Sequence, residues 1–264
     1  MRLGRAVDAA AAAATIVRDE LALALLGDAA RDDVTSAFYD ASSKYAAGSP
    51  HDESGLTPFE EAAVAAHFPP PPARLLVGGA GAGRELVALA ARGYAVEGYE
   101  PVARLVDEAR RALAAHGASG EVWRGGHETL GEALRERATP SFDAVVVGWT
   151  SWAHLLGSAR RVAFLRAVRE ACPRGPVLLS FFGPGPDEPG SPRERVRARV
   201  RRVVAALPGA RPVEAGDALH QGRFFVHHVT PGELAREAEA AGYDVVHHAD
   251  DASTYPHAVL RPRR

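Results

Sequence analysis

The residues best suited to do chemistry lie in a glycine-rich stretch, Gly78-Gly79-Ala80-Gly81-Ala82-Gly83. The stretch follows an apolar run at residues 75–77 and precedes a helical pattern that begins at Arg84. Glycine lets the backbone turn sharply and approach a ligand with no Cβ in the way. The helix behind it would present free N–H groups and the positive end of its dipole to an anionic group. The stretch therefore predicts a ligand-binding turn between a strand and a helix.

The spacing of the glycines distinguishes nicotinamide and flavin sites from sites for other cofactors. Nicotinamide and flavin sites have the pattern Gly-x-Gly-x-x-Gly, whose third glycine allows close helix packing. Counted from Gly79 and Gly81, that third position is Arg84, which fits poorly, whereas the chain has Gly79-x-Gly81-x-Gly83. A nicotinamide oxidoreductase remains an alternative, and a binding experiment with NADH would test it.

An acid follows at the distance expected for a ribose-binding group. Glu100 ends the predicted strand at residues 95–99 and precedes Pro101. It lies 100 − 79 = 21 residues after Gly79, close to the roughly 20 residues typical of an acid that binds ribose hydroxyls. Nicotinamide sites use an acid there too, so Glu100 alone does not discriminate.

His154 is a candidate catalytic base. It follows the valine run at residues 145–147 by a short segment that contains Trp149 and Trp152. Ligands in open α/β sheets bind outside the carboxyl ends of the strands, and imidazole can act as a base near neutral pH. The alternative is a helix-capping or core histidine, and the two tryptophans either wall a pocket or pack in the core.

These residues need a scaffold of alternating strands and helices. The pattern predicts strands at residues 74–77, 95–99, 121–124, 143–147 and 176–182, with helices at 84–92, 102–115, 128–137 and 158–171. Such alternation predicts a doubly wound α/β fold, in which a parallel sheet carries helices on both faces. The valine run lacks polar alternation, as a central strand covered on both sides would.

A run of four prolines at residues 69–72 divides the chain, because proline ends helical structure. We expect a helical N-terminal cap at residues 1–70 and a cofactor-binding domain at 71–264. Within the latter, residues 183–229 interrupt the alternation and predict an inserted lid over the end of the sheet. A capping box at Thr230 opens a helix to Ala241. Two strands joined by a turn, at 243–247 and 258–260, follow it.

The insertion contains a predicted strand at residues 224–229 and a helix that begins at Ser191. The helix carries an apolar stripe of Val196, Val200, Val203 and Leu207. A row of arginines accompanies the stripe: Arg193, Arg195, Arg197, Arg199, Arg201 and Arg202. The arginines form either the solvated face of an amphipathic helix or a site for an anionic acceptor or nucleic acid. The pairs His227-His228 and His247-His248 offer one ligand to each face of a strand, so we expect no metal site.

The ordered set of motifs resembles the class I S-adenosylmethionine-dependent methyltransferases of small-molecule type. The resemblance spans roughly residues 72–261. It rests on the glycine loop, Glu100, the run Phe142-Asp143-Ala144-Val145-Val146-Val147, and the sequence Thr230-Pro231-Gly232-Glu233-Leu234 with Ala241-Gly242-Tyr243. It implies a Rossmann-like methyltransferase sheet, S-adenosyl-L-methionine as cofactor and a small-molecule acceptor.

The resemblance also implies roles for residues near the cofactor. The loop would cradle its methionine part, Glu100 would bind the ribose hydroxyls, and an N-terminal tyrosine, Tyr39 or Tyr45, would fold over it. Arg84, at the start of the helix, either meets the cofactor carboxylate or is solvated. The expected cofactor-binding residues are Gly79, Ala80, Gly81, Gly83, Glu100, Pro101, Glu128, Gly148 and Tyr39.

Two positions depart from the family pattern. Val77 stands where an acid often precedes the loop, and Gly126 stands where an Asp often lies near adenine. Adenine recognition would then use backbone groups or Glu128. These departures favour the second hypothesis, a non-catalytic binding protein with the same fold.

The composition limits the kinds of partner that we expect. The chain has 264 residues, of which 47% are hydrophobic and 24% charged, and its net charge is −2. No overall positive field indicates nucleic acid or an anionic membrane, and no run of about 18 apolar residues predicts a membrane span. Cys172 is the only cysteine, so no intramolecular disulfide can form and a cytoplasmic location is expected. The oligomeric state is not predicted.

Overall fold

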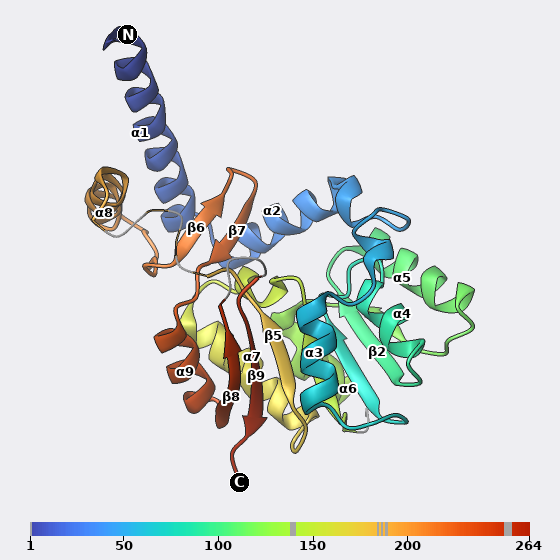
Figure 1. Cartoon of the computed structure of the whole chain (residues 1–264). Coiled ribbons are helices and arrows are strands. Elements are labelled where there is room, and N and C mark those ends of the chain that lie inside the picture. The colour runs from blue at the N-terminus through green and yellow to red at the C-terminus, as the bar shows by residue number, and fades with distance from the viewer. Residues whose placement is uncertain (1, 138–140, 184, 186, 188–189, 251–254) are drawn as a thin grey trace.

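The apolar runs predicted as strands form one seven-stranded sheet in the order β3-β2-β1-β4-β5-β9-β8 (Figure 1). The computed structural model describes residues 2–137, 141–183, 185, 187, 190–250 and 255–264. The strands are β1 Arg74–Gly78, β2 Ala95–Glu100, β3 Val122–Arg124, β4 Ala144–Val147, β5 Val177–Ser180, β8 Tyr243–Ala249 and β9 His257–Pro262.

Five neighbouring strands, β3 to β5 in sheet order, are parallel as predicted. The last two differ, because β9 runs antiparallel to both β5 and β8. Only residues 250–256 separate β8 from β9 in the sequence, and parallel neighbours require a long crossover connection. The short connection therefore turns β9 back between β5 and β8.

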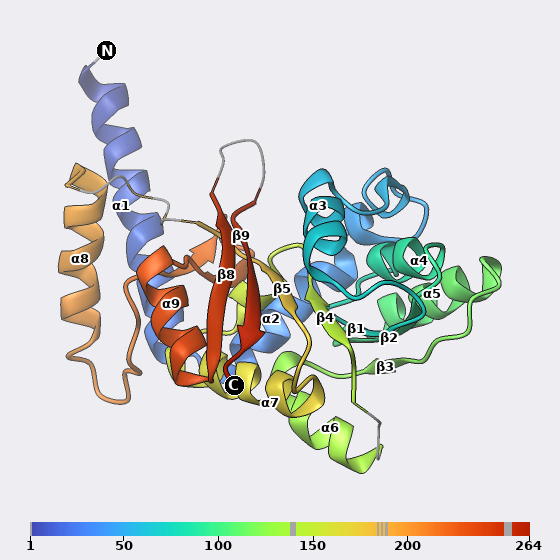
Figure 2. The ribbon, with the colours of Figure 1, turned by 60° about the horizontal axis from the view of Figure 1, so that its bottom comes forward.

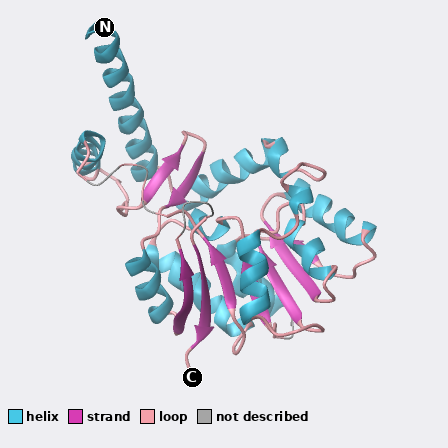
Figure 3. Ribbon diagram, in the orientation of Figure 1, coloured by secondary structure: helices cyan, strands magenta, loops and turns pink. Residues whose placement is uncertain are grey.

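Helices cover both faces of the sheet (Figures 2 and 3). One face carries α3 Pro58–His67, α4 Arg84–Ala90 and α5 Ala103–Ala115, and the other carries α6 Leu130–Glu136, α7 Ser158–Ala171 and α9 Pro231–Ala240. The doubly wound arrangement is thus confirmed.

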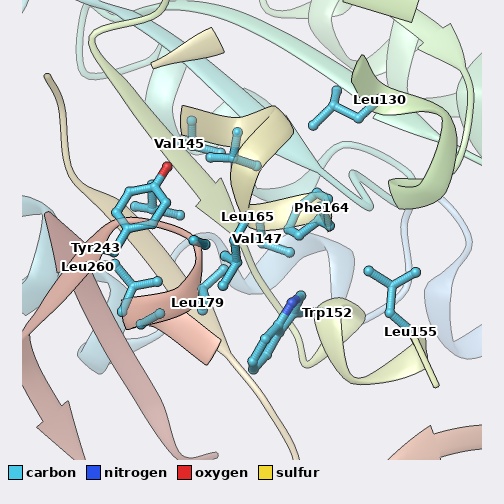
Figure 4. Packing of buried hydrophobic residues seen from close by; sticks show 14 of the residues in the cluster. Leu130, Val145, Val147, Trp152, Leu155, Phe164, Leu165, Leu179, Tyr243 and Leu260 are labelled. Carbon is cyan, nitrogen blue, oxygen red and sulfur yellow. The ribbon is translucent and has the colours of Figure 1, made fainter. Parts of the chain in front are cut away.

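Alternate side chains of the central strands enter separate apolar clusters, as the two-residue period of a strand requires. On β4, Ala144 and Val146 join the cluster with α3, α4 and α5, whereas Val145 and Val147 join the cluster with α6, α7 and α9 (Figure 4). Trp152 is fully buried in this second cluster. The uninterrupted valine run is explained by burial on both faces.

The N-terminal region is helical, as predicted. It contains α1 Arg2–Leu25, α2 Asp28–Ala41 and two short 3₁₀ helices, η1 Ser43–Tyr45 and η2 Asp52–Ser54. In Figures 1 and 2, α1 projects from the body of the molecule. None of the helices that the structure describes is both long and apolar enough to cross a lipid bilayer.

The insertion at 183–229 contains α8 Pro192–Val204 and an antiparallel pair, β6 Asp217–His220 and β7 Phe224–His227. The sequence predicts the helix and the second strand but not β6. The helix lies beside α1 (Figure 2), and the pair packs on α1 and α2. Residues 183–229 thus join the N-terminal helices on one side of the molecule.

Ion pairs fix α8 against α1. Glu20 of α1 is buried, and its carboxylate accepts hydrogen bonds from Arg197 (3.1 Å) and Arg201 (2.7 Å). Arg197 and Arg201 are therefore not part of a solvated face. The helix orientation that pairs these arginines with Glu20 leaves Val196 40% and Val203 64% exposed.

A second buried ion network joins the insertion to the main sheet. Arg161 of α7 is 1% exposed and pairs with Glu237 of α9 (2.7 Å) and Glu214 of the insertion (2.8 Å). It also donates to the carbonyl oxygen of Leu155 (3.1 Å). Removing one partner from a buried ion pair leaves the other charge desolvated.

We predict that Arg161→Ala lowers the free energy of unfolding by about 3–5 kcal/mol, because Glu237 stays buried without a charge partner. Urea unfolding measures the change. Arg263→Ala is the matched control, since Arg263 pairs with Glu239 and Asp244 on the surface, and it should barely move the unfolding midpoint. Equal shifts in the two variants would contradict the role of Arg161.

Candidate functional site

The glycine loop connects β1 to α4 and adopts a backbone that glycine favours. Gly81 has φ +54° and Gly83 has φ +109°, in the region that side chains with a Cβ rarely occupy. A Cβ on Gly81 would meet no atom within 4 Å, whereas a Cβ on Gly83 would lie 3.1 Å from the Cα of Ala109 in α5. Gly81 therefore leaves space for a ligand, and Gly83 allows α4 to pack against α5.

Glu100 binds this loop to the end of β2. Its side chain is buried, and its Oε2 accepts a hydrogen bond from the backbone N–H of Gly81 (3.0 Å) while Oε1 accepts one from Val102 (3.0 Å). Burial raises the pKa of Glu100 to about 7, although both hydrogen bonds favour the charged form. Each carboxylate oxygen keeps a lone pair for a further donor.

A cavity of about 470 Å³ extends from the loop across the carboxyl ends of β1, β2, β3 and β4. This volume is in the range of small-molecule sites. Most of the predicted site residues line it: Tyr39, Gly79, Ala80, Gly81, Glu100, Pro101, Glu128 and His154. Gly83 and Gly148 are not among its lining residues.

The far wall of the cavity comes from α2, which the sequence did not indicate apart from Tyr39. Asp32, Thr35, Ser36 and Tyr39 line the cavity, at spacings that place them on one face of the helix. Nothing in the local sequence distinguishes this face, because the contact depends on how α2 packs over the sheet.

A buried ion network lies behind the loop. The guanidinium group of Arg84 makes two hydrogen bonds of 2.8 Å to Glu60 and one of 2.5 Å to Glu85. Arg84 and Glu85 are each 4% exposed, so the solvated helix start considered for Arg84 is wrong. Burial raises the pKa of Glu85. A Cβ at Gly148 would overlap Glu85 Oε1, so Gly148 makes room for this network.

Glu128 occupies the space that a side chain at Gly126 would take. A Cβ built on Gly126 would overlap the carboxylate of Glu128. A carboxylate is thus present beside the end of β3 even though position 126 is glycine. Next to it, His127 Nδ1 lies 2.7 Å from the hydroxyl of Tyr99, and burial lowers the pKa of His127 to about 3.

His154 and Tyr39 form one hydrogen-bonded pair, although 115 residues separate them. His154 Nδ1 lies 2.8 Å from the carbonyl oxygen of Phe225. A carbonyl only accepts, so Nδ1 carries the hydrogen and Nε2 accepts the hydroxyl hydrogen of Tyr39 at 2.8 Å. Burial lowers the pKa of His154 to about 4. The histidine is half-buried and lines the cavity, and its side chain binds β7 instead of capping a helix.

The two tryptophans have different environments. Trp152 is core, whereas Trp149 lines the cavity. Trp149 and Thr150 have φ of +46° and +63°, an uncommon and strained conformation for residues with a Cβ. Thr150 is held there by a 2.8 Å hydrogen bond from its N–H to Ser180 Oγ. This strained turn directs the chain after β4 along the cavity.

Glu214, Asp217 and His227 place ligand-type atoms within 4.8 Å of one another. His227 Nδ1 lies 2.8 Å from Asp217, and Arg161 lies 2.8 Å from the same Glu214 oxygen that faces the histidine. A guanidinium group at that oxygen opposes a cation. We assign the cluster to packing of the insertion on α7.

Comparison with models of protein families gives no match, and comparison with curated protein sequences gives none. Solved structures do match. The CcbJ methyltransferase from Streptomyces caelestis has a TM-score of 0.62 at 21% identity, over 88% of this chain and 100% of that one. A methyltransferase from Methanosarcina mazei has a TM-score of 0.59 at 16% identity, over 79% and 99%. CalS10, an amino pentose methyltransferase from Micromonospora echinaspora, has a TM-score of 0.52 at 20% identity, over 76% and 87%. The chain therefore has the fold of the class I S-adenosylmethionine-dependent methyltransferases, as predicted.

We predict that His154 stays neutral at pH 6 as the Nδ1–H tautomer, because burial disfavours the imidazolium form. Long-range ¹⁵N–¹H correlation spectra of histidine-labelled protein distinguish the two tautomers and the cation. His154→Gln assigns the signal, and Tyr39→Phe should shift its Nε2 resonance by removing the hydroxyl donor. An imidazolium signal for His154 at pH 6 would contradict this description.

Proposed function

We propose that this chain is an S-adenosylmethionine-dependent methyltransferase that acts on a small-molecule acceptor. The observation that carries the proposal is the buried Glu100 carboxylate bound to the N–H of Gly81, at the point where loop and cavity meet. The chain has a methyltransferase fold, but a fold alone does not establish a function. The residues of the site supply the further support.

The described residues fit this cofactor. The open space at Gly81 suits close approach of the methionine part, and the free lone pairs of Glu100 suit the ribose hydroxyls. At the other end, Glu128 beside Pro101 and Gly126 would meet adenine. Because the Glu128 carboxylate lies where a side chain at position 126 would lie, it could take the role of the usual acid, and Gly126 then does not argue for a non-catalytic protein.

The ion network behind the loop suits the amino-acid end of the cofactor. Glu60, Arg84 and Glu85 together carry two carboxylates and one guanidinium group. Arg84 and Glu85 line the cavity, so they can face a carboxylate and an ammonium group respectively. The family often has an acid just before the loop, where this chain has Val77. The network supplies an acid near the loop in its place.

When bound, S-adenosylmethionine supplies a methyl group on an activated sulfonium leaving group. The protein then needs mainly to align the acceptor and exclude water. His154 is neutral and can take a proton from the acceptor, but its Nε2 is already occupied by the hydroxyl of Tyr39. We infer that the acceptor proton reaches His154 through Tyr39, which requires the neutral Nδ1–H tautomer described above.

Calorimetry with S-adenosylhomocysteine and NADH tests the proposal and its alternatives. We expect the first ligand to bind and NADH not to bind. Gly81→Val should abolish binding, because a branched side chain would fill the open space at the loop. Gly117→Val is the matched control, since Gly117 has φ +66° and open space at the end of α5, outside the cavity.

Equal affinity of wild type and Gly81→Val for S-adenosylhomocysteine would refute the role of the loop, and preferential binding of NADH would refute the cofactor. Methyl-labelled S-adenosylmethionine with a metabolite extract then tests turnover. Cofactor binding with no labelled product from any extract would support the non-catalytic alternative.

We also predict that cofactor binding depends on the ionisation of Glu100. Its pKa of about 7 means that the carboxyl group gains a proton, and loses an acceptor, as the pH falls below neutrality. Affinity for S-adenosylhomocysteine should therefore rise about tenfold from pH 6 to pH 8 and then level off. Glu100→Gln should bind more weakly with a flat profile. The same pH profile in both proteins would assign the titration to another group.

A further inference from the structure

Four aromatic side chains follow one another along one wall of the cofactor cavity. The ring centroids of Tyr39 and Tyr45 are 4.9 Å apart, those of Tyr45 and His51 are 5.3 Å apart, and those of His51 and Trp149 are 4.0 Å apart. All four line the cavity.

Four further rings form a second row outside the residues that line the cavity. Tyr255 and Phe182 have ring centroids 5.9 Å apart, Phe182 and His220 are 5.3 Å apart, and His220 and Phe224 are 5.0 Å apart. They come from the segment after β5, the segment before β9 and the β6–β7 pair.

The two rows join at both ends. Trp149 lies 5.3 Å from Tyr255, and Tyr39 lies 6.0 Å from Phe224. The eight rings thus form a closed circuit, which we call the aromatic collar. Among the residues that the structure describes, no ring contact joins the two rows except at these two junctions.

The collar differs from core packing in its exposure. Seven of its eight members are half-buried, and only Phe224 is buried. By contrast, the core aromatic residues Trp152, Phe181 and Phe225 are at most 1% exposed. The collar rings meet in tilted or T-shaped contacts and keep accessible surface. Such a surface suits the wall of a small-molecule site, which is lined mainly by hydrophobic and aromatic side chains.

The charges in and beside the collar indicate whether it can bind a neutral or a cationic ligand. Its two histidines are uncharged near neutrality, because burial lowers the pKa of His51 to about 4 and lowers that of His220. Lys44 places its ammonium group 5.2 Å from the Tyr45 ring and 5.4 Å from the Trp149 ring. This cation would repel a cationic ligand and attract an oxygen that gains negative charge.

The proton acceptor lies at one junction of the collar. The His154 ring is 5.3 Å from Tyr39 and 5.6 Å from Phe224, and its Nε2 accepts the hydroxyl hydrogen of Tyr39. A hydroxyl group held in the collar could therefore pass its proton to Tyr39 as Tyr39 passes its own to His154.

We propose that the aromatic collar is the acceptor subsite and that the acceptor is a planar aromatic compound with a hydroxyl group. The inference rests on the methyltransferase function proposed above. In the reaction, the phenol oxygen forms a bond to the methyl carbon as the carbon–sulfur bond breaks, and the sulfur keeps the electron pair. The phenol proton passes through Tyr39 to His154 and from there to water, because burial disfavours the imidazolium form of His154. The products are an aryl methyl ether and S-adenosylhomocysteine.

Calorimetry with 2-naphthol as probe tests the ligand class, with the protein saturated with S-adenosylhomocysteine. Decahydro-2-naphthol, its saturated counterpart, and 2-(aminomethyl)naphthalene, a cation, are the comparisons. We expect 2-naphthol to bind at least about tenfold more tightly than either. Equal binding of the saturated alcohol would overturn the aromatic requirement, and tighter binding of the amine would indicate a cationic acceptor.

Substitutions of collar residues that do not line the cofactor cavity test where the acceptor binds. Phe182→Ala should weaken 2-naphthol binding about tenfold and leave S-adenosylhomocysteine affinity within twofold, and Tyr255→Ala should do the same if Phe182→Ala does not fold. Tyr94→Ala is the matched control, since Tyr94 is half-buried at the start of β2 and bonds to Pro69. Unchanged naphthol binding in the collar variants would overturn the proposal.

The same titrations separate the two proposals. If wild-type protein fails to bind S-adenosylhomocysteine, the cofactor assignment and the proposed function fail together. If it binds S-adenosylhomocysteine but not 2-naphthol, only the acceptor proposal fails.

Discussion

The N–H of Gly81 and the carboxylate of Glu100 meet where β1 and β2 end, and the candidate site is built around this contact. It can form only because β1 and β2 are adjacent and parallel, so that the loop after one strand faces the last residue of the other. A buried acid at this point costs free energy unless its oxygens are hydrogen-bonded. Gly81 and Val102 supply those bonds, and the loop is fixed at the edge of the cavity.

Burial then determines the chemistry that the site can do. Burial is the largest cause of the lowered pKa of His51, His127 and His154, so the site holds neutral imidazoles. Behind the loop, the guanidinium group of Arg84 is paired with Glu60 and Glu85. Such a site does not rely on a charged base, which agrees with a reaction whose leaving group is already activated. Position and exclusion of water are the main demands on the protein.

Local sequence patterns predicted those parts of the fold and the site that depend on interactions between residues close in the sequence. The glycine spacing, the acid after β2 and the strand at 143–147 each follow from backbone freedom or hydrophobic periodicity. The strand β6 and the burial of Arg84 depend on contacts between distant segments, and no short window of sequence contains them. Tyr39 and His154 were each candidates, but their hydrogen bond spans 115 residues and was not predictable. For the collar, Tyr39, Tyr45 and Trp149 were candidates from the sequence, whereas Phe182, His220, Phe224 and Tyr255 were not, because contacts between distant segments bring them together.

A crystal structure of the wild-type protein with S-adenosylhomocysteine tests the central claim most directly. The account predicts that both ribose hydroxyls bind the Glu100 carboxylate, that the homocysteine part passes the open side of Gly81, and that adenine lies beside Glu128. A ligand bound elsewhere, or one that lies in the cavity while Glu100 contacts only Gly81 and Val102, would contradict it.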